Sequence, residues 1–147
     1  MKKPPASKPE RFSNTSLAGA QFSDVDLSGA ELCNVAMKDA RLDDVDLSRT
    51  RVHNATFEGG DLDDVTWEGA RIHNANFART TLEDVTFEDA GVHNASLERA
   101  RFSDVTLRGA RFDDVDLTGV QITSAAIEGL SINGVRIDEL LRERTKS

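Results

Sequence analysis

Large apolar residues recur at every fifth position along nearly the whole chain. From position 12 to position 137 the series holds 26 apolar centres without an exception. A period of five fits neither the repeat of about 3.6 residues of an amphipathic helix nor the repeat of about two of a strand. The pattern predicts a chain that turns a corner every five residues and buries each centre. The centres are Phe12, Leu17, Phe22, Leu27, Leu32, Met37, Leu42, Leu47, Val52, Phe57, Leu62, Trp67, Ile72, Phe77, Leu82, Phe87, Val92, Leu97, Phe102, Leu107, Phe112, Leu117, Ile122, Ile127, Ile132 and Ile137.

Two further positions of each five-residue unit are restricted in residue type. The residue two before the centre is small and apolar, with departures at Glu10, Thr15, Thr50, Gly60 and Thr80. The residue two after the centre is Gly, Asn or Asp at 21 of the 26 places, with departures at Arg49, Arg79, Arg99, Ser124 and Glu139. Gly, Asn and Asp best tolerate the positive φ of the second central residue of a type II turn. The units therefore predict a second inner column and a turn at each corner.

A longer period of twenty residues gives the number of corners in one circuit. His53, His73 and His93 are twenty apart, and an Asp-Val pair recurs at the same interval from Asp24 to Asp104. Four units per circuit predict about 6.5 coils from the 26 centres. If residues twenty apart stack at the strand spacing of ~4.8 Å, the coils form a rod roughly 31 Å long.

The small-x-Leu/Phe-x-x unit resembles that of the pentapeptide-repeat proteins over residues 10 to 139. The resemblance implies an all-β, right-handed quadrilateral β-helix. The chain departs from the family pattern just before the centre, where Asn or Asp is common but Arg51, Arg71, Thr86 and Arg101 stand here. An internal ladder of Asn or Asp is therefore not expected. Some members of the family bind DNA gyrase or topoisomerase IV as mimics of DNA.

The repeat divides the chain into three segments. Residues 1–9 are rich in Lys, Pro and Ser and predict a disordered basic tail, and residues 10–137 form the β-helix. Residues 138–147 break the repeat and predict a short helix, in which Leu140 and Leu141 need a surface to pack on. They either cap the last coil or form a symmetric dimer contact; the resemblance keeps the second alternative open, because gyrase-protecting members dimerise through C-terminal helices.

Composition limits the location and the chemistry. The start of the chain lacks the apolar stretch of a secretory signal, and no apolar run is long enough to cross a membrane. The single Cys33 cannot form an internal disulfide. We therefore expect a cytosolic protein. We find no catalytic motif and expect neither catalysis nor a cofactor. His53, His73 and His93 share one column and are candidates for a metal site. We favour a solvated ladder inherited from duplicated coils, because a flat column gives poor tetrahedral geometry.

The distribution of charged residues indicates that the protein binds a partner. The net charge is −8, and folding the sequence at twenty residues per coil gathers eight carboxylates into what we call the acidic face: Asp24, Asp43, Asp44, Asp63, Asp64, Glu83, Asp84 and Asp104. A second region gathers Arg49, Arg51, Arg71, Arg79, Arg99 and Arg111 with the three His residues. Regularly spaced surface anions could imitate the phosphates of DNA. The sequence thus predicts a non-catalytic rod that binds a protein through its acidic face, and alternatively a DNA-mimicking inhibitor or protector of DNA gyrase or topoisomerase IV. The negative charge disfavours direct binding of nucleic acid.

Overall fold

The computed structural model describes residues 10–145, and the predicted tail of residues 1–9 lies outside them. Strands of up to six residues recur every ten positions, and one helix follows them. The helix α1, Ile137–Thr145, begins one residue before the predicted start. The strands are β1 Arg11–Ser16, β2 Gln21–Asp26, β3 Glu31–Ala36, β4 Arg41–Asp46, β5 Arg51–Thr56, β6 Asp61–Thr66, β7 Arg71–Asn76, β8 Thr81–Glu83, β9 Gly91–Ser96, β10 Arg101–Thr106, β11 Arg111–Asp116, β12 Gln121–Ala126, β13 Ser131–Ile132 and β14 Val135–Arg136.

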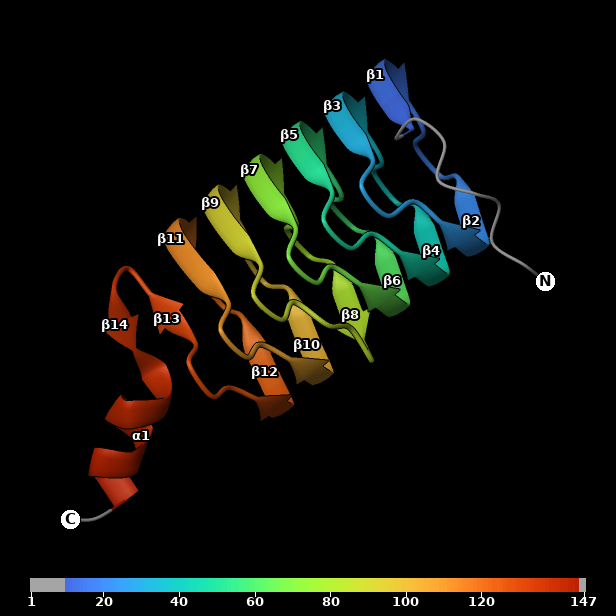
Figure 1. Ribbon diagram of the computed structural model, residues 1–147. Coiled ribbons are helices and arrows are strands. Elements are labelled where there is room, and N and C mark those ends of the chain that lie inside the picture. The colour runs from blue at the N-terminus through green and yellow to red at the C-terminus, as the bar shows by residue number, and fades with distance from the viewer. Residues whose placement is uncertain (1–9, 146–147) are drawn as a thin grey trace.

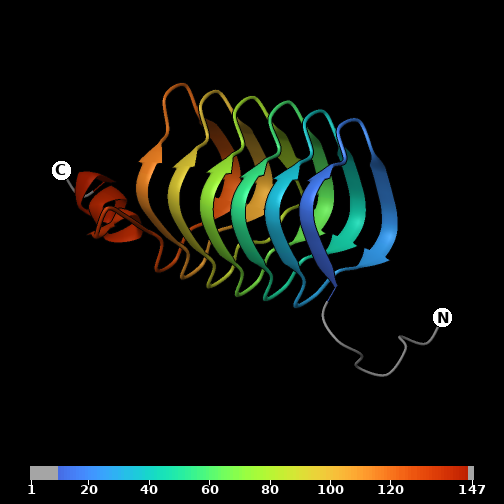
Figure 2. The same ribbon diagram turned by 90° about the horizontal axis from the view of Figure 1, so that it is seen from above.

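The strands form two parallel sheets that face each other across one core (Figures 1 and 2). We call the sheet of β1, β3, β5, β7, β9, β11 and β13 the odd sheet, in which β14 adds one antiparallel strand, and that of β2 to β12 the even sheet. Each strand pairs with the strand two further along the chain, so that Phe12 lies beside Leu32 and Leu42 beside Leu62. The predicted coil of twenty residues is therefore confirmed.

Each coil has four corners, and a residue with positive φ stands at every one from residue 14 to residue 134. Two corners per coil are hydrogen-bonded turns, as where the Ala20 amide donates to the Leu17 carbonyl over 3.0 Å. The other two lie inside the strands, where Asn14 or Asp24 separates paired residues on either side. Positive φ also occurs at the four corners that carry neither Gly, Asn nor Asp. The φ angles there are 57° for Arg49, 56° for Arg79, 60° for Arg99 and 53° for Ser124. Stacking on the neighbouring coils overrides their local preference.

The interior consists of the two predicted inner columns. Leu62, Trp67 and Leu82 are fully buried, and the Trp67 ring lies among Phe57, Phe77 and Phe87. Thr50 and Thr80 are buried as well, and each hydroxyl donates to the backbone carbonyl three residues earlier, at 2.8 and 2.7 Å. This bond satisfies the hydroxyl and explains why Thr is tolerated in a column of Ala and Val.

The two ends of the solenoid are less closed than its middle. Phe12, Leu17 and Phe22 in the first coil are half-buried, and Ile122 near the last coil is 44% exposed. The helix α1 follows the last coil and extends beyond it (Figure 1). In residues 10–145 no helix is long and apolar enough to span a lipid bilayer.

Candidate protein-binding face

The acidic face lies on the outer surface of the even sheet. Asp43, Asp63 and Glu83 follow one another as paired residues of β4, β6 and β8. The corner residues Asp24, Asp44, Asp64, Asp84 and Asp104 form the adjoining column, and all five have positive φ. Asp43 and Asp63 are half-buried, whereas the other six side chains are exposed. The structure therefore brings together all eight carboxylates that the sequence grouped.

The odd sheet offers a direct comparison, because five of its equivalent corners carry amides, from Asn14 to Asn94, and Asp114 follows them. Asn34, Asn54, Asn74 and Asn94 each donate from Nδ2 to Oδ1 of the Asn one coil earlier, starting from Asn14. The first three bonds measure 2.9, 3.0 and 3.1 Å. Asn thus satisfies the positive φ of a corner and also links the coils. Asp at the same corners of the even sheet offers no such chain of bonds between ionised side chains.

The close spacing of the carboxylates affects the pKa values of two of them. The pKa of Asp44 is raised, first by the hydrogen bond that its carboxyl shares with Asp24 and then by the charges of Asp24, Asp64 and Asp43 together with partial desolvation. The pKa of Asp63 is raised by desolvation first, and then by its acidic neighbours, of which Asp43 contributes most. Repulsion by neighbouring carboxylates contributes to both shifts, although it is the leading cause of neither. A positively charged partner would relieve that repulsion.

The three His side chains stack as predicted on the outside of the odd sheet. Their rings are parallel, with centroids 5.3 Å apart for His53 and His73 and 5.1 Å apart for His73 and His93. In this stack the nitrogen lone pairs lie in parallel planes and do not converge on one point. Among residues 10–145, no three His, Cys, Asp or Glu side chains are grouped so as to hold a metal ion.

The predicted arginine region is wrong in part. Arg49 precedes β5 of the odd sheet and lies near Arg51 and the His column, whereas Arg79 and Arg99 precede β8 and β10 of the even sheet. The two groups are half a circuit apart, because thirty residues from Arg49 to Arg79 are one and a half coils. Only Arg49, Arg51, Arg71 and Arg111 belong with the imidazoles.

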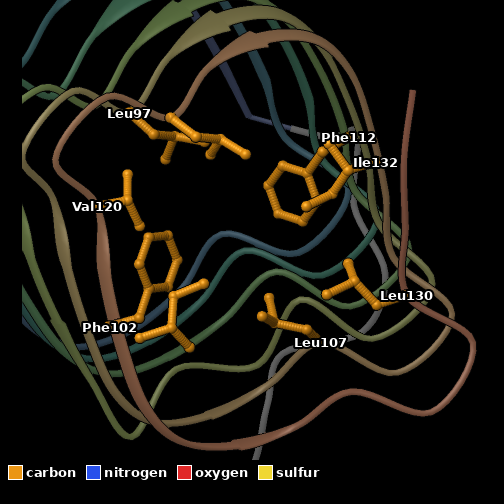
Figure 3. Close-up of a pocket in the computed structure, with 9 residues that line it drawn as sticks. Leu97, Phe102, Leu107, Phe112, Val120, Leu130 and Ile132 are labelled. Atoms are coloured by element: carbon orange, nitrogen blue, oxygen red, sulfur yellow. The ribbon is translucent and has the colours of Figure 1, made fainter. Parts of the chain in front are cut away.

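The last coil ends in an open apolar cavity of about 220 Å³ (Figure 3). Its lining includes Phe102, Leu107, Phe112, Leu130 and Ile132, and no residue of α1 lines it. Leu140 and Leu141 are 46% and 47% exposed, and Leu141 contributes to a shallow depression against residues 125–128. The helix thus leaves both leucines and the cavity accessible. The alternatives of a cap and of a dimer contact remain predictions.

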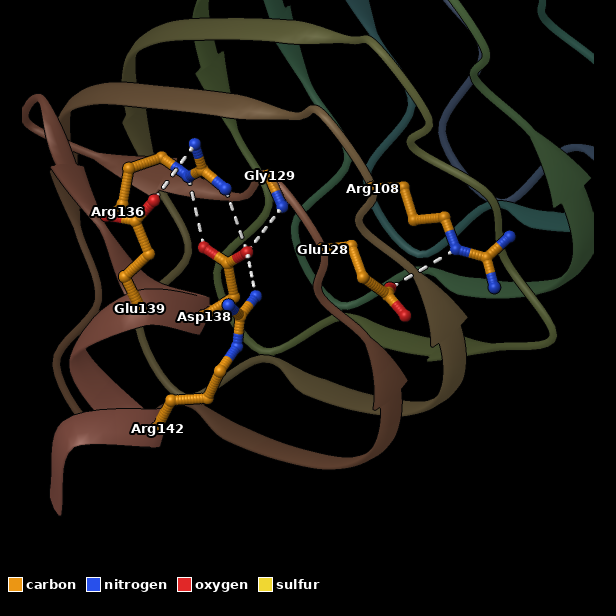
Figure 4. A network of polar contacts seen from close by, with 7 residues as sticks. All are labelled: Arg108, Glu128, Gly129, Arg136, Asp138, Glu139 and Arg142. Atoms are coloured by element: carbon orange, nitrogen blue, oxygen red, sulfur yellow. Dashed lines mark hydrogen bonds and ion pairs between the residues drawn. The ribbon is translucent and has the colours of Figure 1, made fainter. Parts of the chain in front are cut away.

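A buried carboxylate attaches α1 to the coils (Figure 4). Asp138 is 6% exposed and accepts hydrogen bonds from the Gly129 amide at 3.0 Å, from two nitrogens of Arg136 at 3.0 and 2.9 Å, and from Arg142 at 3.1 Å. The hydrogen bond from Arg136, followed by that from Gly129, lowers the pKa of Asp138. Sequence reasoning did not identify this contact, because Asp138 occurs in a segment that breaks the repeat.

Comparison with known proteins agrees with the coil geometry. Residues 60–137 match the profile described as Pentapeptide repeat region, and residues 11–49 match that of Pentapeptide repeats (8 copies). No curated protein sequence matches this chain.

Several solved structures are similar. HetL, a pentapeptide repeat protein involved in heterocyst differentiation regulation from Nostoc sp. strain PCC 7120, is 15% identical, with 88% of this chain and 94% of that chain covered and a TM-score of 0.32. A pentapeptide repeat protein of the Arabidopsis thaliana thylakoid lumen is 23% identical, with coverages of 69% and 68% and a TM-score of 0.46. QnrB1, a plasmid-mediated fluoroquinolone resistance protein, is 19% identical, with coverages of 95% and 89% and a TM-score of 0.40.

Proposed function

Because this chain belongs to the pentapeptide repeat family, we propose that it is a non-catalytic, cytosolic binding rod whose acidic face docks onto a basic surface of a partner protein. The observation that carries the proposal is the contrast between the two sheets. Equivalent corners carry hydrogen-bonded Asn on the odd sheet and mutually repelling Asp on the even sheet. Both residue types tolerate the positive φ of these corners, so turn geometry does not explain the choice of Asp over Asn, and we infer that a partner with a basic surface does.

The spacing of the charges supports a rigid, extended contact. The even sheet repeats its carboxylates once per coil in two adjoining columns. The corner column runs from β2 to β10, and the second column runs from β4 to β8. Since the backbone is paired on both sides of each corner, the charges are held in place before a partner arrives. Such a surface is preorganised and binds with little loss of conformational entropy. It also raises the rate of encounter with a basic groove.

A type II topoisomerase is our more specific candidate partner. Its DNA-binding surface is expected to be basic, and the linear array of carboxylates offers it negative charges in place of phosphates. In this reading the protein inhibits or protects DNA gyrase or topoisomerase IV. The proposal rests on the charge pattern of this chain and on the known behaviour of some members of the family.

The test is a supercoiling and binding assay with purified gyrase. The variant Asp44→Asn/Asp64→Asn/Asp84→Asn removes three charges while keeping residues that tolerate positive φ. A control variant, Glu98→Gln/Asp113→Asn/Asp114→Asn, removes three charges away from the acidic face. We expect the parent and the control to bind and to alter supercoiling, and the first variant to bind at least about tenfold more weakly. Equal behaviour of both variants would refute a role for the acidic face, and no effect of the parent would refute the topoisomerase as partner.

The second alternative for the C-terminal end concerns oligomeric state. Leu140 and Leu141 are half-exposed, and no residue of α1 lines the apolar cavity of the last coil, which supports a symmetric dimer contact over a simple cap. A dimer would present two acidic faces to one two-fold symmetric partner.

A further inference from the structure

A groove of about 560 Å³ crosses the outer surface of the odd sheet at β7, β9 and β11. The arginines Arg71 and Arg111 lie at its two ends, and His73 and His93 lie along one side. Its centre is Gly91, which pairs with Arg71 on one side and with Arg111 on the other. The groove lies on the opposite sheet from the acidic face, so it is a separate surface.

Gly91 interrupts a column of arginines where the fold does not need a glycine. It lacks positive φ, and a Cβ atom added to it would meet no heavy atom within 4 Å. Gly60 is the contrasting case, since its Cβ would lie 2.9 Å from the Phe57 carbonyl oxygen. Neither backbone conformation nor packing therefore requires glycine at position 91. Its effect is to leave bare backbone between two guanidinium groups.

The two arginines are available for a ligand. Within residues 10–145 neither Arg71 nor Arg111 forms an ion pair, whereas Arg79 pairs with Glu58 and Arg108 pairs with Glu128 at 3.2 Å. Their Cα atoms are two strand spacings apart, or roughly 9.6 Å. Two long side chains reaching inward from that separation can hold one small anion between them. Each guanidinium can then donate two parallel hydrogen bonds to it.

We propose that this groove binds a phosphate monoester, with the phosphate held between Arg71 and Arg111 over the backbone of Gly91. A tetrahedral phosphate has enough oxygens to accept paired hydrogen bonds from both sides, which a planar carboxylate does not. His73 and His93, whose rings are 5.1 Å apart, provide further N–H donors on the wall.

The remaining polar lining indicates what else the ligand carries. Asp89 and Asp113 also line the groove, and as carboxylates they accept hydrogen bonds from hydroxyl groups. Their negative charge limits the number of phosphate groups that the groove tolerates. The space exceeds that of a single phosphate, which leaves room for a small organic portion. The ligand class is therefore a small hydroxylated monophosphate and not a polyphosphate.

The test is a titration of the full chain followed by NMR of the His73 and His93 ring protons at neutral pH. Probes are inorganic phosphate, glycerol phosphate, acetate and tripolyphosphate. We expect saturable shifts with the first two, with glycerol phosphate binding more tightly, and no saturation with acetate or tripolyphosphate. Saturation by acetate at the same concentrations would overturn the assignment to phosphate, and tighter binding of tripolyphosphate would overturn the limit on ligand charge.

Variants distinguish specific binding in the groove from nonspecific attraction of anions to arginine side chains. Gly91→Ile fills the floor without changing charge, and its Cβ meets no heavy atom within 4 Å. We expect Gly91→Ile, Arg71→Gln and Arg111→Gln each to weaken phosphate binding at least about tenfold, and Arg101→Gln on the even sheet to have no effect. An unchanged circular dichroism spectrum shows that each variant is folded. Binding by folded Gly91→Ile equal to that of the parent would refute the proposal. Because the variant Asp44→Asn/Asp64→Asn/Asp84→Asn keeps this groove, the proposal stands or falls independently of the acidic face.

Discussion

The same substitution is expected to have opposite effects at Gly60, which directly precedes β6 of the even sheet, and at Gly91, the first residue of β9 in the odd sheet. Gly60 and Gly91 both lack positive φ, so replacing either by alanine introduces no left-handed strain. Gly91→Ala places its Cβ in open space, whereas Gly60→Ala places it 2.9 Å from the Phe57 carbonyl oxygen and 3.1 Å from that of Ala40. These oxygens belong to the backbone and cannot turn away as a flexible side chain can.

The magnitudes follow from two opposing effects. Alanine at a compatible position stabilises a protein by about 0.4–1 kcal/mol, because the unfolded chain has less freedom to lose. Overpacking a buried site costs about 1–3 kcal/mol. Gly91→Ala is therefore expected to raise the free energy of unfolding by about 0.5 kcal/mol, and Gly60→Ala to lower it by about 1–2 kcal/mol. For a chain of this size, the difference corresponds to about 4–8 °C in the melting midpoint.

The measurement is thermal and urea unfolding of the parent and both variants. The chain has one Trp and no Tyr, and Trp67 is fully buried among Phe rings, so its fluorescence reports the loss of the core while circular dichroism reports the strands. Equal shifts in the same direction for the two variants would refute the packing argument at Gly60.

Further predictions concern the core, the charges and the C-terminal end. Trp67→Phe is expected to leave the free energy of unfolding unchanged within about 1 kcal/mol or to raise it. The smaller ring costs about 1 kcal/mol, but the substitution also removes the buried indole N–H, which lacks a hydrogen-bond partner. A loss above about 2 kcal/mol would contradict this expectation. The raised pKa values of Asp44 and Asp63 mean that the folded state binds these protons more readily than the unfolded chain. The melting midpoint should therefore rise as pH falls through their folded pKa values toward the ordinary value of 3.8, and this rise should disappear in Asp44→Asn/Asp63→Asn. The pKa of Asp138 is lowered from 3.8, so the ionised carboxylate stabilises the fold above pH 3.8, and this stabilisation is lost as pH falls below that value. A pH series of melting curves should show this acid-induced loss in the parent but not in Asp138→Asn. In analytical sedimentation, the parent protein should behave as a dimer and the variant Leu140→Ser/Leu141→Ser as a folded monomer. If the parent is a monomer and the variant melts at a lower temperature, the two leucines form a cap.

The geometry of the coil could be predicted from the amino-acid pattern alone. A five-residue period leaves no regular helix or flat strand that buries all 26 centres, and the twenty-residue recurrence sets which residues stack. For that reason the inner columns, the corners and the grouping of the acidic face could be predicted residue by residue. In a solenoid, each surface neighbour is given by adding or subtracting one coil length, so sequence separation translates directly into position.

Features that the repeat does not encode became clear from the three-dimensional arrangement of the coils. The separation of thirty residues between Arg49 and Arg79 already places them half a circuit apart, so the error in the predicted arginine region lay in the interpretation of the sequence. The bonding of the Asn column, the attachment of Asp138 to Gly129 and the cavity beyond Phe112 depend instead on side-chain directions and on where the array stops. These features arise from contacts between coils and at an end, where neighbours are set by packing in three dimensions and not by the local preference of a five-residue unit.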